Sequence, residues 1–184
     1  ADSGGMTTTQ TFTITVVNVN DAPAFTSVPV LAATQDVAYT YTVVATDPDL
    51  RYGDALVITS LTIPSWLTLA DHGDGTATLS GMPTNADVGD HPVVLQVADS
   101  GGMTTTQTFT ITVVNVNDAP AFVNTLVFVA VQNVLYTYTA IATDPDLSYG
   151  DTLAITALVL PSWLTLTDQG DGTARLVGTP TNAD

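Results

Sequence analysis

A period-two pattern decides the fold: residues 107–113 read Gln-Thr-Phe-Thr-Ile-Thr-Val. Threonine occupies every second position, and Phe109, Ile111 and Val113 stand at the positions between. Successive side chains of a β-strand point to opposite faces. The alternation therefore predicts a half-buried strand with its threonines toward water and its apolar side chains toward a core. Residues 39–43, Tyr-Thr-Tyr-Thr-Val, repeat the pattern and predict a second such strand.

Shorter apolar runs predict further strands at residues 55–58, 66–69 and 92–97. Asp74 and Gly75, between Leu69 and Leu79, indicate a hairpin, since glycine accepts a positive φ. Apolar residues nowhere recur at helical spacing. About seven strands of this kind in one repeat predict an all-β fold, a tandem array of antiparallel immunoglobulin-like β-sandwiches.

Internal repetition sets the domain organisation. Residues Ala1–Phe25 recur unchanged as Ala98–Phe122, an offset of 97 residues, and the later segments stay in register without insertion or deletion. A long fixed period of this kind is typical of tandem repeats. We expect residues 1–19 to be the last strand of a preceding repeat and residues 20–116 to be a complete repeat. Residues 117–184 would then be a repeat that lacks its last two strands, and the chain a window of a longer array.

The composition excludes several classes of function. The net charge is −16, all 18 acidic residues are aspartates, and Arg51 and Arg175 are the only lysine or arginine residues. Such a chain cannot neutralise a phosphate backbone, which excludes nucleic-acid binding and argues against an anionic membrane surface. No apolar run approaches the ~20 residues of a membrane-spanning helix. We therefore expect neither a nucleic-acid partner nor membrane insertion of this segment.

The sequence also argues against an enzyme. It contains no cysteine and no lysine, which removes two classes of nucleophile. Gln169 stands 97 residues after His72, so a Ser-His-Asp site that used His72 would not recur in the second copy. We expect no catalytic residues and no organic cofactor.

Three motifs resemble those of cadherin repeats. Residues 45–49 (Ala-Thr-Asp-Pro-Asp) are similar to the cadherin Ala-x-Asp-x-Asp motif, and residues 98–102 (Ala-Asp-Ser-Gly-Gly) to Ala-x-Asp-x-Gly. Residues 18–23 (Asn-Val-Asn-Asp-Ala-Pro) resemble the Asp-x-Asn-Asp-x-Pro linker. Residues 64–69 and 79–83 resemble the dystroglycan-type cadherin-like domains, and the "putative Ig" domains, of large bacterial surface proteins. The resemblance extends over the whole chain.

This resemblance implies calcium at the pole of each repeat that faces the preceding linker. Ca²⁺ takes six to eight oxygen ligands, mostly carboxylates and carbonyls. Several carboxylates at one pole also repel each other, and a divalent cation removes that cost. The implied ligands of the two joints are Asn20, Asp21, Asp47, Asp49 and Asp99, and then Asn117, Asp118, Asp144 and Asp146.

The chain departs from the cadherin pattern because it has no glutamate. Cadherins supply glutamates from the preceding domain. Here Gln35 and Asp36 fall near one such position, and Asn85 and Asp87 near the other. We therefore expect about one to three calcium ions at each joint. The aspartates of the two Tyr-Gly-Asp segments, Asp54 and Asp151, are interpreted as turn residues rather than ligands.

The resulting hypothesis is a calcium-rigidified structural repeat of an extracellular adhesin or cell-surface fibre, acting as a spacer and in cell adhesion. Its partners would be neighbouring repeats of the same protein, including self-association into a fibre. The alternative is a carbohydrate- or protein-binding β-sandwich module, with Trp66 and Trp163 as candidate sugar-stacking platforms. Burial of these tryptophans in the core would count against that alternative.

Overall fold

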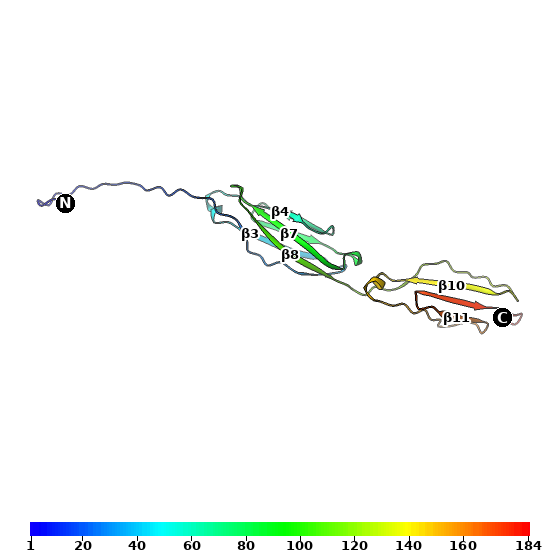
Figure 1. The fold of residues 1–184 in the computed structure, drawn as a ribbon. Helices are drawn as coiled ribbons and strands as arrows, with labels where there is room; N and C mark the ends of the chain where they lie inside the picture. Colours follow the sequence, from blue (N-terminus) through cyan, green and yellow to red (C-terminus); the bar gives the residue numbers. More distant parts are fainter. The chain divides into compact units, whose positions relative to one another are not determined.

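The structure is a computed structural model that describes residues 1–184 (Figure 1). Its close contacts fall into two compact units, which we call the first and the second packing unit. The first packing unit comprises Ala1–Val30, Thr40–Ser80 and Pro92–Thr110. The second packing unit comprises Leu31–Tyr39, Gly81–His91 and Ile111–Asp184.

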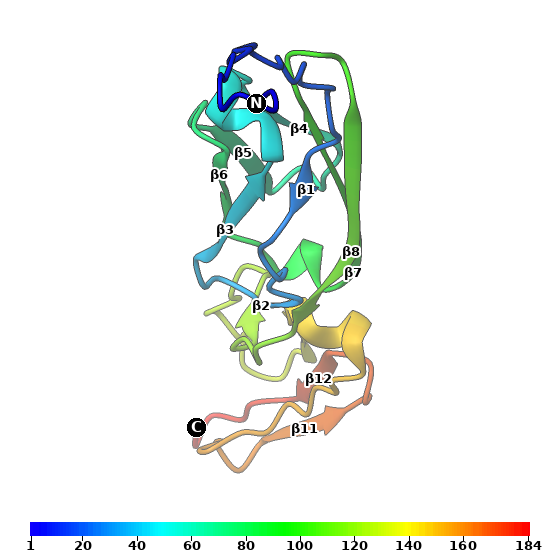
Figure 2. The same ribbon diagram turned by 90° about the vertical axis from the view of Figure 1, so that its left-hand side faces the viewer.

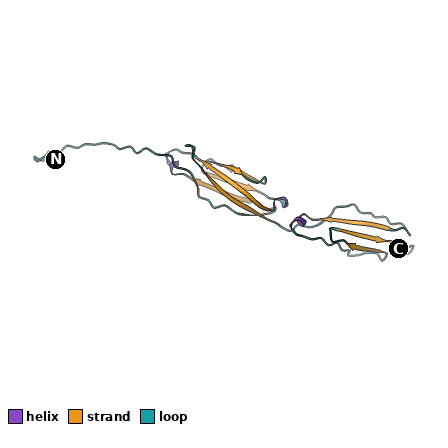
Figure 3. Ribbon diagram, in the orientation of Figure 1, coloured by secondary structure: helices purple, strands orange, loops and turns teal.

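Eight strands lie between residues 24 and 114, and they form two four-stranded sheets with the orders β1-β3-β6-β5 and β2-β8-β7-β4 (Figures 1 and 3). Figures 1 and 2 both show β7 and β8 side by side. Pairing is antiparallel for β1 with β3 and for β4 with β7, whereas β2 pairs with β8 in parallel. The strands are β1 (Ala24–Phe25), β2 (Ala32–Thr34), β3 (Tyr39–Thr46), β4 (Val57–Thr62), β5 (Leu67–Asp71), β6 (Thr76–Gly81), β7 (Gly89–Ala98) and β8 (Thr104–Val114).

The predicted strand faces are confirmed. Along β3, Tyr39, Tyr41 and Val43 are buried and the threonines between them are exposed. Along β8, Ile111 and Val113 are buried and the alternate threonines face water. The two shortest strands, β1 and β2, escaped prediction because two or three residues carry no readable period.

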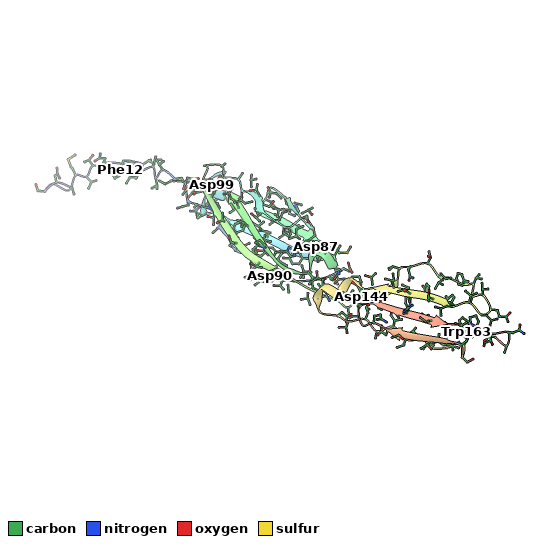
Figure 4. The ribbon with its side chains drawn as sticks, turned by 45° about the vertical axis from the view of Figure 1, so that its right-hand side comes forward. Phe12, Asp87, Asp90, Asp99, Asp144 and Trp163 are labelled. Atoms are coloured by element: carbon green, nitrogen blue, oxygen red, sulfur yellow. The ribbon has the colours of Figure 1, made fainter.

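Two identical segments differ in structure. Residues 104–114 form β8, whereas their copy at residues 7–17 belongs to no strand. Phe109 packs edge-to-face against Tyr41 with ring centroids 5.9 Å apart, while its copy Phe12 is 73 % exposed (Figure 4). A strand requires a partner for its backbone N–H and C=O groups, and β8 has β2 and β7. The assignment of residues 1–19 to a preceding repeat stays a prediction.

The second repeat reproduces the first sheet. Its order is β11-β12-β10-β9, which matches β5-β6-β3-β1 strand for strand. The small core contains Ala140, Ile155 and Ala174, with Tyr138 and Leu166 packed against them. No helix in the structure is long and apolar enough to cross a membrane. The strands are β9 (Ala121–Phe122), β10 (Tyr136–Thr143), β11 (Leu164–Asp168) and β12 (Thr173–Gly178).

Three short 3₁₀ turns complete the fold: η1 (Pro48–Tyr52), η2 (Asn85–Asp87) and η3 (Pro145–Tyr149). Two of them, η1 and η3, directly follow the equivalent strands β3 and β10. These two turns and the residues that cap them, Asp47 and Asp144, include four of the seven aspartates that the sequence predicts as ligands.

Candidate calcium sites

The segment after β3 folds locally in a way that turns its aspartates inward. Asp47 is extended and caps η1, and its Oδ1 accepts a hydrogen bond from the Asp49 backbone N–H at 2.7 Å. Proline suits the first helical position for two reasons. Its fixed φ is close to the helical value, and the N–H that it lacks would have no partner within the helix there. Gly53, with a φ of 96°, ends the turn in the left-handed region that glycine tolerates. Asp144 repeats the arrangement by accepting from the Asp146 N–H at 2.8 Å.

Asp49 holds the linker that enters the first repeat. Its carboxylate is buried, with 3 % of the residue exposed. Oδ1 accepts from the Asn18 side-chain amide at 2.9 Å, and Oδ2 accepts from the Asp21 backbone N–H at 2.7 Å. The predicted ligand Asp21 thus meets Asp49 through its backbone rather than through its carboxylate.

Asp99 lies at the end of β7 and holds the linker at a second point (Figure 4). Its Oδ1 accepts from the Met103 backbone N–H at 2.8 Å. Its Oδ2 accepts from the Asn20 side-chain amide at 2.9 Å. Asn20 and Asp99, both implied by the resemblance as ligands of the first joint, are therefore in direct contact.

Gly101 makes room for this contact. A Cβ at Gly101 would lie 2.6 Å from the carboxamide atoms of Asn20, closer than real Cβ contacts come. We expect Gly101→Ala to displace Asn20 and to lower the free energy of unfolding by about 1 kcal/mol, the typical net worth of one hydrogen bond. Gly4→Ala is the matched control. Gly4 is the copy of Gly101, 97 residues earlier, and a Cβ at Gly4 would meet only Asp2 Oδ1, at an ordinary contact distance of 3.5 Å. Urea unfolding compares the two variants, and equal midpoints would refute the steric argument.

Three carboxylates of the first packing unit converge. One carboxylate oxygen from each of Asp47, Asp54 and Asp99 lies within 4.8 Å of the others, and we call this set the first acidic cluster. Asp54, which the sequence predicts as a turn residue rather than a ligand, belongs to it. The Ser100 hydroxyl donates to Asp54 Oδ1, and the Ser100 backbone N–H donates to the same oxygen at 2.9 Å. The hydrogen bond from the Ser100 hydroxyl is the main cause that lowers the pKa of Asp54, and the backbone bonds lower it further. The group is therefore ionised at neutral pH.

The first acidic cluster has unmet bonding capacity. Asp47 is 5 % exposed, and its Oδ2 is buried without a hydrogen-bond partner, as is Asp54 Oδ2. Two carboxylates within 4.8 Å, such as those of Asp47 and Asp99, repel by roughly 3 kcal/mol at an effective dielectric constant of about 20. The nearby Arg51 lays its guanidinium over the Tyr52 ring, at 4.8 Å. Hard oxygen donors with uncompensated charge fit a calcium ion.

The second packing unit contains an equivalent set, the second acidic cluster, formed by Asp144, Asp146 and Asp151 within 4.8 Å (Figure 4 labels Asp144). Asp144 and Asp146 are buried, and each has one carboxylate oxygen without a partner. The Asp118 backbone N–H donates to Asp146 Oδ2 at 2.5 Å. The predicted ligand Asn117 donates instead to the Asp118 carbonyl, at 3.0 Å.

Gln35 and Asn85, which lie near the positions where cadherins have glutamates, form hydrogen bonds with Asp118 and Pro145. The side-chain amide of Gln35, which is 2 % exposed, donates to Asp118 Oδ2 at 2.8 Å. The Asn85 side-chain amide donates to the Pro145 carbonyl at 3.0 Å, and the Tyr149 hydroxyl donates to the Asn85 carbonyl at 2.7 Å. Asp87, by contrast, bonds its own turn by accepting from the Thr84 N–H at 2.8 Å.

The tryptophans of the alternative hypothesis are both half-buried. Trp163 packs edge-to-face on Tyr136, with ring centroids 5.9 Å apart (Figure 4 labels Trp163). Neither ring is a fully exposed platform for a sugar. Carbohydrate binding through these residues stays a prediction.

Comparison with known proteins decides the family. The family described as "Putative Ig domain" matches residues 22–114, just over half of the chain. The chain belongs to this family. The match spans both sheets of the first sandwich and confirms the predicted Ig-like, cadherin-like fold. A comparison with curated proteins gave no match.

The chain is also similar to solved structures. Protocadherin Gamma B2 extracellular cadherin domains 1–5 align with 86 % of the chain at a TM-score of 0.55 and 15 % identity. Endo-fucoidan hydrolase MfFcnA4, from glycoside hydrolase family 107, aligns with 89 % of the chain at 30 % identity and a TM-score of 0.46. The chain spans 32 % of the protocadherin structure and 25 % of the hydrolase. The protocadherin likeness shows a shared fold and nothing of the function.

Proposed function

We propose that the chain is a calcium-stabilised structural repeat of an extracellular adhesin or surface fibre. Each Ig-like repeat acts as a spacer, and its partners are the neighbouring repeats of the same protein. The residues proposed to bind or flank the ions are those of the two joints, Asn20, Asp21, Asp47, Asp49, Asp99, Asn117, Asp118, Asp144 and Asp146.

One observation carries the proposal: buried aspartate oxygens without partners recur at equivalent positions of both repeats. Asp47 Oδ2 and Asp144 Oδ2, which are 97 residues apart, are both buried and unpaired. A buried ionised carboxylate is costly unless it is paired or coordinates a metal. The cost at both positions falls if each carboxylate coordinates a divalent cation.

In this proposal the ions neutralise the aspartates, and hydrogen bonds within the chain hold the aspartates in place. The η1 and η3 turns aim their aspartates inward through the Asp49 and Asp146 N–H bonds. The same η1 turn binds the linker through Asn18 and Asp21. An ion at the turn and a linker hydrogen-bonded to the same turn together restrict how one repeat moves against the next. This restriction is the mechanical role that we propose for calcium.

Small-angle X-ray scattering of the 184-residue chain tests this role. We expect a larger maximum dimension in calcium than in EDTA, because the joint between the repeats stiffens. Asp144→Ala combined with Asp146→Ala should keep the EDTA dimension in both buffers. Asp168→Ala combined with Asp171→Ala, on the exposed β11–β12 hairpin, removes the same charge and should respond to calcium like the parent chain. A scattering profile that calcium leaves unchanged would refute the role.

A further inference from the structure

We propose that Asp54 is a cation ligand that makes the first acidic cluster a complete site within one repeat, independent of the linker. Asp54 lies outside the three motifs that resemble cadherin repeats. The inference rests on the proposed function, because it concerns the same ion. It adds a ligand and separates ion binding from linker binding.

The three carboxylates are preorganised by their own repeat. In each of them a backbone N–H fixes Oδ1: that of Asp49 for Asp47 at 2.7 Å, that of Ser100 for Asp54 at 2.9 Å, and that of Met103 for Asp99 at 2.8 Å. The Oδ2 atoms of Asp47 and Asp54 are buried without partners. A backbone hydrogen bond to Oδ1 thus orients each of the three carboxylates. Asp47 and Asp54 each keep an Oδ2 without a partner, which is available to an ion.

The linker contributes little to this cluster. It contacts the cluster through the amide of Asn20, which donates to Asp99 Oδ2 at 2.9 Å. The Asn18 side-chain amide and the Asp21 backbone N–H donate instead to Asp49, whose carboxylate is not a member of the cluster. Asp49 therefore holds the linker, while Asp47, Asp54 and Asp99 hold the ion.

The second repeat supports Asp54 as a ligand, whereas Asp146, the copy of Asp49, is a cluster member and also accepts from the Asp118 N–H of the linker. Asp151, the copy of Asp54, lies within 4.8 Å of Asp144 and Asp146. Its Oδ1 is likewise fixed, by the Thr152 backbone N–H at 2.9 Å. Two repeats that differ at neighbouring positions, with Arg51 replaced by Ser148, keep the aspartate and its place beside the other acids.

A pocket lies beside the first acidic cluster, and Asp54 is the member of the cluster that lines it. This shallow pocket of about 260 Å³ is also lined by Asp49, Tyr52, Ser100 and the linker residues Asn18 and Asn20. Tyr52 is 61 % exposed, so a tyrosine ring stands beside the proposed entrance.

Calcium titration calorimetry of the full chain tests the inference. Asp54→Asn keeps the size of the side chain and removes its charge. We expect it to weaken binding at one site by at least about tenfold, or to remove one site from the stoichiometry. Asp71→Asn, on the exposed β5 hairpin, is the control for charge and should bind like the parent chain. Asn18→Ala removes a linker bond to Asp49 and should bind at this site within about threefold of the parent.

Each outcome has a distinct meaning. If the parent chain takes up no calcium, the proposed function fails, and this inference falls with it. If the parent binds calcium and Asp54→Asn binds with the same affinity and stoichiometry, the function stands and Asp54 is not a ligand. If Asn18→Ala loses the site as fully as Asp54→Asn, the site belongs to the joint and not to one repeat. Circular dichroism of Asp54→Asn in EDTA checks that the fold is intact, which the removal of one repelling charge should favour.

Discussion

Calcium is expected to raise the free energy of unfolding by about 2.7 kcal/mol for each site held at 100 times its Kd. The reason is mass action, because the clusters assemble their carboxylates only in the folded chain. With two acidic clusters, the expected gain is about 5 kcal/mol, which is a large part of the stability of an ordinary domain.

Urea unfolding in calcium and in EDTA measures this gain. Asp47→Asn combined with Asp144→Asn should remove most of the difference, because each change takes a charged ligand from one cluster. Asp71→Asn combined with Asp168→Asn is the matched control on the two exposed hairpins and should keep the full difference. Coincident unfolding curves of the parent chain in calcium and EDTA would contradict the prediction.

Magnesium gives a second control. Mg²⁺ demands near-ideal octahedral geometry and gives up its water reluctantly, so it is rarely held by a cage made only of protein oxygens. We therefore expect the same concentration of magnesium to stabilise the chain by less than calcium does. The comparison separates coordination from general screening of the charge of −16, which both ions would provide.

The sandwich was predictable where one pattern extends over many residues. The alternation along β3 and β8 specified both the strands and their buried faces. The same sequence at residues 7–17 shows the limit of that reasoning, because it forms no strand where β2 and β7 are not beside it. Alternation is a statement about side chains, whereas a strand also needs backbone partners.

The candidate site was predictable in its local part. The spacing of Asp47 and Asp49 around Pro48 specifies a capped turn, and the turn alone brings these aspartates inward. Asp54 was missed as a cluster member because its position depends on Ser100, 46 residues further along the chain. The available signal was its exact recurrence as Asp151 in a segment where neighbouring residues vary.

Gln35→Glu is expected to change stability in opposite directions in EDTA and in calcium. The Gln35 amide donates to Asp118 Oδ2 at 2.8 Å and to Asp36 Oδ2 at 3.3 Å, while its Oε1 accepts from the Val116 N–H. Glutamate keeps the acceptor and replaces the donor with a third negative charge in a buried position. In EDTA at pH 7 we expect a loss of about 3 kcal/mol, limited by protonation of the introduced carboxyl to at most about 4 kcal/mol.

The loss in EDTA should depend on pH with a defined sign. Crowding by Asp36 and Asp118 raises the pKa of the introduced carboxyl in the folded chain, so the folded state binds a proton that the unfolded state has released. The variant should therefore be nearly as stable as the parent in acid, and the difference should grow as the pH rises to neutrality. Chemical unfolding of both chains across this range in EDTA measures it. A loss that does not vary with pH would point to a packing defect instead.

In calcium the same substitution should be favourable, because the third carboxylate becomes an additional ligand beside Asp118. Ligand charge is one of the factors that set calcium affinity, so we expect Gln35→Glu to bind calcium about tenfold more tightly than the parent. Gln132→Glu is the matched control: it makes the same change at the equivalent, exposed position 97 residues later and should alter neither stability nor affinity. An equal loss from both variants in EDTA would trace the effect to net charge. A destabilised Gln35→Glu that calcium does not rescue would separate Gln35 and Asp118 from any ion site, and would leave their hydrogen bond as a structural contact alone.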